Sequence, residues 1–135
     1  MVTAEVHDTR GIDAVLEDSR TELDRVTVRE AYNQLTDGAL LIDIRPVAQR
    51  QEEGEVDVPV LYIERNVLEW RLDPWSEARI PEASQDARIL VLCQEGYASS
   101  LAAESLQRVG LPGATDVIGG FRAWREAGLP VAEGR

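Results

Sequence analysis

Two short runs of almost uninterrupted apolar residues constrain the fold of this chain more than any other feature. Residues 39–44 read Ala-Leu-Leu-Ile-Asp-Ile, and residues 88–92 read Arg-Ile-Leu-Val-Leu. Runs of this length without polar alternation are typical of strands covered on both faces, as in a parallel sheet. Helical patterns separate these runs from weaker strand patterns at residues 60–63 and 115–118. The sequence therefore predicts an α/β fold with a mainly parallel central sheet and helices on both faces.

Helix signals lie between the predicted strands. The sequence Thr27-Val28-Arg29-Glu30 has the form of a capping box, which predicts a helix over residues 28–35. Further helices are expected over residues 46–53, 64–72, 99–109 and 120–126, and residues 75–86 are expected to be mostly irregular. Residues 13–25 carry a loose helical pattern. We therefore expect an amino-terminal helical extension over residues 1–25 and one α/β domain over residues 26–135.

Charge and composition restrict the partners and the compartment. The formal net charge is -11, from 14 basic and 25 acidic residues, so nucleic acid and anionic membrane surfaces are not expected as partners. No stretch approaches the roughly 20 apolar residues that span a bilayer, and residues 1–22 do not resemble a signal peptide. The single cysteine cannot form an intramolecular disulfide. We expect a cytoplasmic protein, and His7, in a loose segment, is expected to be exposed.

Cys93 is the residue most indicative of chemistry, because it follows the apolar run that ends at Leu92. Ligands of open parallel sheets bind beyond the carboxyl ends of the strands. After Cys93 a short loop containing Gly96 leads into a predicted helix near Ser99, so backbone amides and the positive helix end can stabilise a thiolate. The hydroxyl groups of Ser99 and Ser100 could donate to the sulfur or cap the helix. The alternative is an inert, buried cysteine that only fills space.

The chain resembles the rhodanese family of single-domain sulfurtransferases between Val26 and Val131. The resemblance rests on three segments in the same order as in the family: Leu41-Ile42-Asp43-Ile44-Arg45, Cys93 to Ser99, and Gly119-Gly120-Phe121-Arg122-Ala123-Trp124 with Gly128-Leu129-Pro130-Val131. The family implies a five-stranded parallel sheet and a Cys93 thiolate that takes sulfur from a donor such as thiosulfate. The resulting Cys93 persulfide is discharged by cyanide or a thiol.

The resemblance also implies the residues of the site. Cys93 is the expected catalytic residue, and the rest of the loop is expected to bind substrate: Gln94, Glu95, Gly96, Tyr97, Ala98 and Ser99. No cofactor and no metal are expected. The expected partners are a small sulfur donor and a thiol acceptor, which could be a protein. Asp43 and Arg45 match positions that look structural. The sequence contains no indication of the oligomeric state.

The loop departs from the family at several positions. Many active members carry basic residues at the second and sixth loop positions, where this chain has Gln94 and Ala98. Glu95 adds a negative charge, which opposes thiolate formation and repels dianionic thiosulfate. Arg65 and Arg71 could supply positive charge, although solvent-facing helix arginines are the commoner case.

Three functions therefore remain open. The first is a sulfurtransferase, the second a non-catalytic sulfur carrier or protein-binding module, and the third a thiol redox sensor. The family also resembles the dual-specificity phosphatases of the cell cycle, whose longer loop ends in an arginine that grips phosphate. Ser99 and Ser100 stand where that arginine could fall, which argues against phosphate chemistry.

Overall fold

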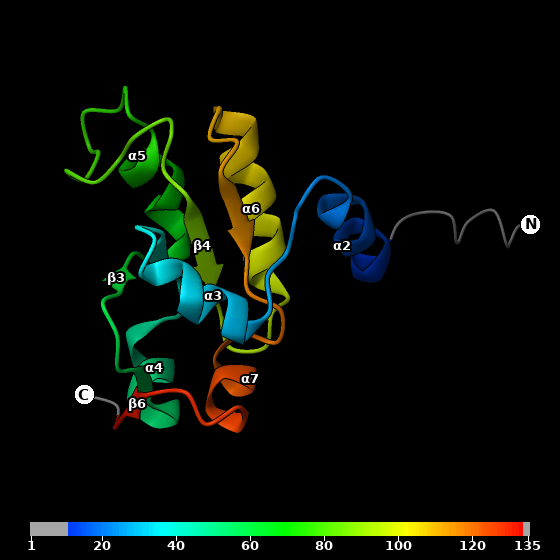
Figure 1. Ribbon diagram of the computed structural model, residues 1–135. Helices are drawn as coiled ribbons and strands as arrows, with labels where there is room; N and C mark the ends of the chain where they lie inside the picture. Colours follow the sequence, from blue (N-terminus) through cyan, green and yellow to red (C-terminus); the bar gives the residue numbers. More distant parts are fainter. Residues whose placement is uncertain (1–10, 134–135) are drawn as a thin grey trace, which may run out of the picture.

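Four parallel strands form the centre of the computed structural model, which describes residues 11–133 (Figure 1). Their order across the sheet is β3-β1-β4-β5, with bounds β3 Leu61–Tyr62, β1 Leu40–Asp43, β4 Ile89–Leu92 and β5 Ala114–Asp116. Val26 adds a parallel bridge to Val117 at the β5 edge. The expected α/β fold with a mainly parallel sheet is confirmed, but the fifth position is a single bridge and not a strand. The chain is extended there for so short a distance because Thr27 already caps the next helix.

A second sheet lies apart from the first and was not expected. It pairs β2, Glu55–Val56, with β6, Val131–Ala132, in antiparallel orientation. Each strand has two residues, which is too short for an alternating pattern to be read from sequence. The pairing joins the segment after the helix Val47–Glu53 to the carboxyl end of the described chain.

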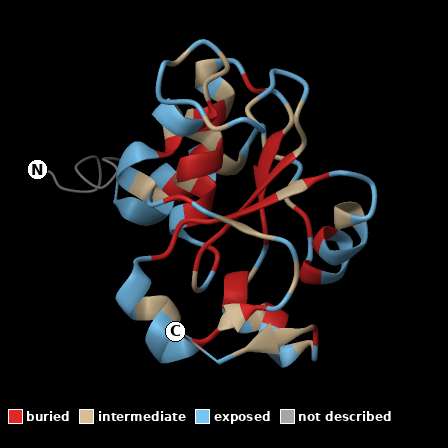
Figure 2. Ribbon diagram, turned by 90° about the vertical axis from the view of Figure 1, so that its left-hand side faces the viewer, coloured by how far each residue is buried: buried red, intermediate tan, exposed pale blue. Residues whose placement is uncertain are grey.

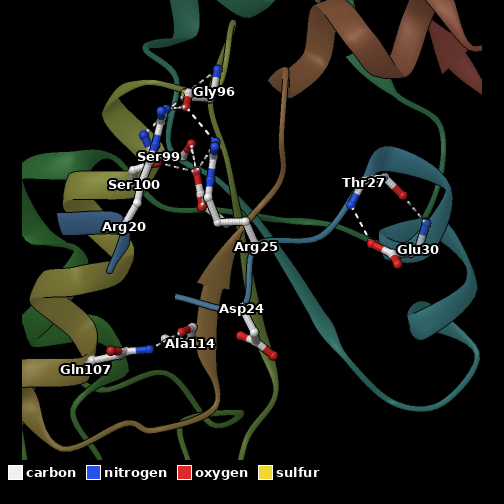
Figure 3. A network of polar contacts seen from close by, with 12 residues as sticks. Arg20, Asp24, Arg25, Thr27, Glu30, Gly96, Ser99, Ser100, Gln107 and Ala114 are labelled. Carbon is white, nitrogen blue, oxygen red and sulfur yellow. Dashed lines mark hydrogen bonds and ion pairs between the residues drawn. The ribbon is translucent and has the colours of Figure 1, made fainter. Parts of the chain in front are cut away.

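The helices follow the predicted capping signals closely. Their bounds are α2 Ile12–Arg20, α3 Val28–Leu35, α4 Val47–Glu53, α5 Leu68–Leu72, α6 Ala98–Val109 and α7 Gly120–Glu126, with a 3-10 turn η1 at Arg65–Val67. The capping box is present: the Thr27 hydroxyl accepts from the Glu30 amide, and the Glu30 carboxylate accepts from the Thr27 amide (Figure 3). The helix predicted over residues 64–72 is instead the short pair η1 and α5. Residues 75–86 contain no helix or strand, as predicted.

Alternate residues of the strands point into two separate cores, one on each face of the sheet. Figure 2 colours the central strands mostly as buried. Leu90 and Leu92 of β4 pack with residues of α3 and α7. Ile89 and Val91 pack on the other face with residues of α5 and α6. Cys93 continues this second face. The period of two along a strand thus directs the Cys93 side chain towards the face that α6 covers.

Helix α2 lies outside the sheet and packs beside α6 (Figure 1). Its buried side chains are Leu16 and Ser19. Within residues 11–133, no helix is long and apolar enough to cross a membrane. His7 lies outside the described residues.

Candidate active site

The Cys93 sulfur lies one residue beyond the carboxyl end of β4 and is buried, with 6% of the residue exposed. Two backbone amides of the following loop donate hydrogen bonds to Sγ: that of Gly96 at 3.2 Å and that of Ser99 at 3.3 Å. Ser99 belongs to the first turn of α6, which begins at Ala98. The positive end of this helix therefore adds to the two amides. An anionic sulfur is well accommodated in such a place.

The loop directs its amides inwards because other groups hold its carbonyls. The amide of Phe121 donates to the Cys93 carbonyl at 2.8 Å, and the amide of Arg122 donates to the Gln94 carbonyl at 3.0 Å. Both donors lie in the first turn of α7, where amides lack helical partners. A side chain at Gly120 would place Cβ 2.3 Å from the Cys93 carbonyl oxygen. Gly120, the first residue of α7, therefore allows this helix to approach the loop.

Gly96 holds the loop in a conformation that other residues rarely adopt. Its φ is +88°, and a Cβ built on it would lie 2.6 Å from the Gly119 amide nitrogen. Its carbonyl accepts a hydrogen bond from Arg20 Nη2 at 2.9 Å and another from Arg25 Nη2 at 3.0 Å. Figure 3 shows both guanidinium groups reaching this one oxygen.

Asp116, at the end of β5, accepts hydrogen bonds from the hydroxyl groups of Ser99 and Ser100. Ser99 Oγ lies 2.7 Å and Ser100 Oγ 2.9 Å from its Oδ2, and all three residues are buried. Arg25 forms an ion pair with the same carboxylate at 2.9 Å. The serine hydroxyls therefore donate to a carboxylate, and the contact of Ser99 with the sulfur is made by its amide. A buried charge is tolerated when it is paired and hydrogen-bonded in this way.

The remaining loop residues face outwards. Gln94 accepts from Arg45 Nη1 at 2.8 Å and donates to Glu53 at 3.2 Å. Glu95 forms an exposed ion pair with Arg122 at 3.1 Å, so its charge is screened by solvent and by its partner. Tyr97 is 58% exposed.

An open hollow of about 380 Å³ lies over the sulfur. It is lined by Gln49, Cys93, Gln94, Glu95, Tyr97 and Ala98. A second hollow of about 510 Å³ shares Gln49, Gln94 and Glu95 with the first and extends to α7, where Arg122 and Arg125 line it. The structure therefore brings the predicted loop residues to one opening, with Gly96 and Ser99 beneath it.

The arginines that the sequence offered as sources of positive charge lie elsewhere. Arg65 forms an ion pair with Glu69 at 2.9 Å, and Arg71 donates to the Ala78 carbonyl at 3.3 Å. Neither residue lines the hollow over Cys93. Positive charge near the loop comes from Arg20, Arg25 and Arg122 instead.

Asp43 and Arg45 form a buried ion pair at 2.8 Å, with both side chains 0% exposed. Arg45 also donates to the Gly54 carbonyl, and its guanidinium lies 4.3 Å from the centre of the Phe121 ring. Through these contacts and its bond to Gln94, Arg45 connects β1 with the loop, with the end of α4 and with α7. Tyr62, next to this region, has its pKa raised to about 12 by burial and by its hydrogen bond to Glu55.

Sequence reasoning missed four residues of the site. Gln49 could have been found, because it follows the carboxyl end of β1, the neighbour of β4. Arg20, Arg25 and Asp116 carry no local motif, and only the folded chain brings them to the loop. Within the described residues no group of three or more His, Cys, Asp or Glu side chains could hold a metal ion.

The parallel sheet and the buried thiol in its loop define an α/β protein with a thiol site at the carboxyl edge. The family model for the rhodanese-like domain matches residues 27–127, and the chain belongs to that family.

Relatives agree with this assignment. Thiosulfate sulfurtransferase 16, chloroplastic, from Arabidopsis thaliana is 31% identical over 109 residues, covering 78% of this chain and 89% of the relative. Adenylyltransferase and sulfurtransferase MOCS3-1 from Zea mays is 37% identical over 103 residues, which are 74% of this chain. The match spans 21% of the maize protein's length.

A solved structure from Rhodopseudomonas palustris superposes with a TM-score of 0.81 at 31% identity, covering 91% of this chain and 95% of that one. That protein is described as one of unknown function and a possible tyrosine phosphatase. A thiosulfate sulfurtransferase from Pseudomonas aeruginosa shares the fold at 19% identity, with a TM-score of 0.72 over 92% of this chain and 23% of that one.

Proposed function

We propose that this protein is a sulfurtransferase that carries sulfane sulfur on Cys93. The observation that supports this most is the pair of amides, from Gly96 and Ser99, that donate to the Cys93 sulfur at the base of an open hollow. These donors favour the thiolate at Sγ before sulfur is added, and again when Sγ leaves as a thiolate on discharge of the persulfide. Because a thiolate needs no proton removed, the reaction requires no general base.

The first step forms a persulfide. The Cys93 thiolate attacks the outer sulfur of a donor such as thiosulfate, a bond forms between the two sulfurs, and sulfite leaves with the electron pair of the broken bond. In the second step, cyanide or a thiolate attacks the terminal sulfur of the persulfide and takes it, and Sγ leaves as a thiolate. The loop residues Gln94, Glu95, Tyr97 and Ala98 line the opening and would contact donor and acceptor.

The acceptor is proposed to be a thiol, either small or on a protein. The name of the maize relative joins a sulfurtransferase to an adenylyltransferase, and this chain matches a fifth of that protein. A cytoplasmic location suits the chemistry, because a reducing compartment keeps a lone thiol available.

The first experiment measures the intact mass of the protein after incubation with thiosulfate and, separately, with mercaptopyruvate. The wild type should gain one sulfur atom, about 32 Da, and Cys93→Ser should gain none. A wild type that takes no sulfur from either donor would overturn the proposal.

The alternative is a sulfur carrier or protein-binding module without turnover, which the uncharged side chains of Gln94 and Ala98 favour. Thiocyanate release from cyanide separates the two functions. Many cycles per protein molecule indicate an enzyme, and a single discharge of the persulfide indicates a carrier.

Phosphatase chemistry, suggested by the description of the Rhodopseudomonas palustris protein, has little support at this site. The loop between Cys93 and α6 contains no arginine. Arg20 and Arg25, which contact the loop at Gly96, are already bound to the Ser100 hydroxyl and to Asp116 respectively. We expect no hydrolysis of p-nitrophenyl phosphate above the rate of Cys93→Ser.

A further inference from the structure

We propose that Arg20 and Arg25 are positioning residues of the sulfur site, so that helix α2 and the segment after it form part of that site. This inference rests on the proposed function. Both residues precede residue 27, where the match to the rhodanese-like domain begins. They are therefore features of this chain that the family model does not describe.

The two guanidinium groups hold one of the two amide donors to the sulfur. Gly96 donates its amide to Cys93 Sγ, and its carbonyl accepts from Arg20 and from Arg25. Glycine has the widest conformational freedom of all residues. The hydrogen bonds of the Gly96 amide and of its carbonyl restrict that freedom. They also keep the carbonyl oxygen, with its partial negative charge, directed towards the two arginines.

The same residues also hold the second amide donor. Ser99 donates its amide to Sγ and its hydroxyl to Asp116, and Asp116 is fixed by two hydrogen bonds from Arg25. Arg20 donates through Nε to the Ser100 hydroxyl, which also contacts Asp116. One network of two guanidinium groups, one carboxylate and two hydroxyls thus supports both donors. Figure 3 shows how Arg20, Arg25 and the residues at the start of α6 lie in it.

The charges of this network favour an anion at the sulfur. Arg20 and Arg25 bring two positive charges and Asp116 brings one negative charge. The Arg25 side chain is 18% exposed and that of Asp116 is 0% exposed, so solvent screens these charges less than it would screen surface groups. The network therefore supplies both geometry and positive charge at a loop that has no basic residue between Cys93 and Ser100.

Arg20 is the better residue to test, because replacing Arg25 would leave Asp116 buried without its ion pair. We compare Arg20→Gln, which removes the charge, with Arg20→Lys, which keeps it. Arg29→Gln is the matched control: Arg29 also donates to a distant backbone carbonyl, that of Ala127 at 3.2 Å, but away from the loop.

Three quantities are measured on each full-length variant: the rate of Cys93 alkylation by iodoacetamide at pH 7, hydrogen exchange at the Gly96 and Ser99 amides, and thermal unfolding. Arg20→Gln should lower the alkylation rate by about three- to tenfold and speed exchange at both amides, since the loop loses a charge-assisted bond. Arg20→Lys should restore most of the rate, and Arg29→Gln should match the wild type in rate and exchange.

The proposal is wrong if folded Arg20→Gln is alkylated as fast as the wild type or faster, or if Arg29→Gln slows alkylation equally. Alkylation does not involve sulfur transfer. A wild type that takes no sulfur would therefore overturn the proposed function while leaving this comparison intact. Conversely, persulfide formation in the wild type with unchanged alkylation in Arg20→Gln would overturn only the positioning role.

Discussion

At the scale of single residues, Gly96 combines two requirements that can be separated by experiment. Its φ of +88° is unfavourable for any residue with a side chain, and Gly119 leaves no room for a Cβ. Gly38 has a similar φ of +94° but no atom within 4 Å of the position of a Cβ. The pair therefore distinguishes backbone strain from the close approach of the loop to α7.

We predict that Gly38→Ala destabilises the fold by about 1 kcal/mol, the cost of a left-handed backbone alone. Gly96→Ala should cost roughly 2 kcal/mol more, because the loop must also move away from Gly119. Urea unfolding of both variants measures the difference, and the mass assay should show reduced sulfur uptake for Gly96→Ala only. Equal destabilisation of the two variants would mean that the loop can move away from Gly119 without a measurable loss of stability.

We expect the charge of Glu95 to affect how well the proposed site tolerates an anionic donor. Its carboxylate lines the hollow and is half-exposed beside Arg122. We predict that Glu95→Gln raises kcat/KM for thiosulfate by about three- to tenfold at low salt, because a repulsive charge is removed. The gain should shrink at high salt. Glu77→Gln, an exposed position in the irregular segment, controls for net charge, and an equal gain in that variant would refute a local effect.

The sequence predicted the centre of this site better than its surroundings. The position of Cys93, the glycine in the loop and the helix that follows are local features, and from them the sequence indicated that backbone amides of the loop could reach the sulfur. The contacts of Arg20, Arg25 and Asp116 span more than 70 residues along the chain. No spacing rule links these positions, since α2 has no motif and Asp116 resembles any polar residue at a strand end.

At the scale of helices and strands, the capping box and the glycine caps predicted helix boundaries close to those observed. These signals are local, because each involves residues only a few positions apart. The strands β2 and β6 escaped prediction since pairing between distant dipeptides leaves no periodic trace. The junction between α5 and α6 likewise depends on side chains 36 residues apart: the Ser105 hydroxyl donates to Glu69.

Through Glu69, the contact between α5 and α6 stabilises the fold to an extent that depends on pH. Burial alone would raise its pKa, but hydrogen bonds from Ser105 and from its own backbone, together with Arg65, lower the pKa below its ordinary value. A carboxyl group with a lowered folded pKa stabilises the fold above its unfolded pKa, and this contribution disappears as the pH falls through the folded pKa.

We predict that Ser105→Ala lowers the free energy of unfolding by about 1 kcal/mol at pH 7. The difference from wild type should shrink as the pH falls from 7 towards 3, because protonation of Glu69 removes the carboxylate that the Ser105 hydroxyl stabilises. Urea midpoints at the two pH values test this. Glu69→Gln serves as the reference without a titrating group, and a deficit of Ser105→Ala that grew at pH 3 would contradict the assignment.

At the scale of the whole molecule, Arg45 connects β1 with the Cys93 loop, with the end of α4 and with α7 at the edge of the sheet that carries the site. Its ion pair with Asp43 is fully buried, and its other contacts reach Gly54, Gln94 and Phe121. The structural role expected for this pair from the sequence agrees with these contacts.

We predict that Arg45→Met costs about 3–5 kcal/mol, because it leaves the Asp43 carboxylate buried without a partner. The double substitution Asp43→Asn with Arg45→Met should recover part of that loss, since no charge remains unpaired. Urea unfolding measures both variants. If the double variant were less stable than Arg45→Met, the stabilisation would come from packing of the arginine and not from charge pairing.

The burial of Cys93 also limits which thiols can react with it. A disulfide requires two Cα atoms about 4.4–6.8 Å apart, and Cys93 follows a central strand, 6% exposed beneath its own loop. We therefore expect that two folded copies do not bring their backbones so close at this point. Oxidation should therefore not couple the protein to itself through Cys93, whereas a slender thiol, or a cysteine at the tip of a flexible tail, can enter. We thus expect the shape of the opening to prevent a disulfide between two copies of this chain and to admit only thiols carried on slender molecules or flexible segments.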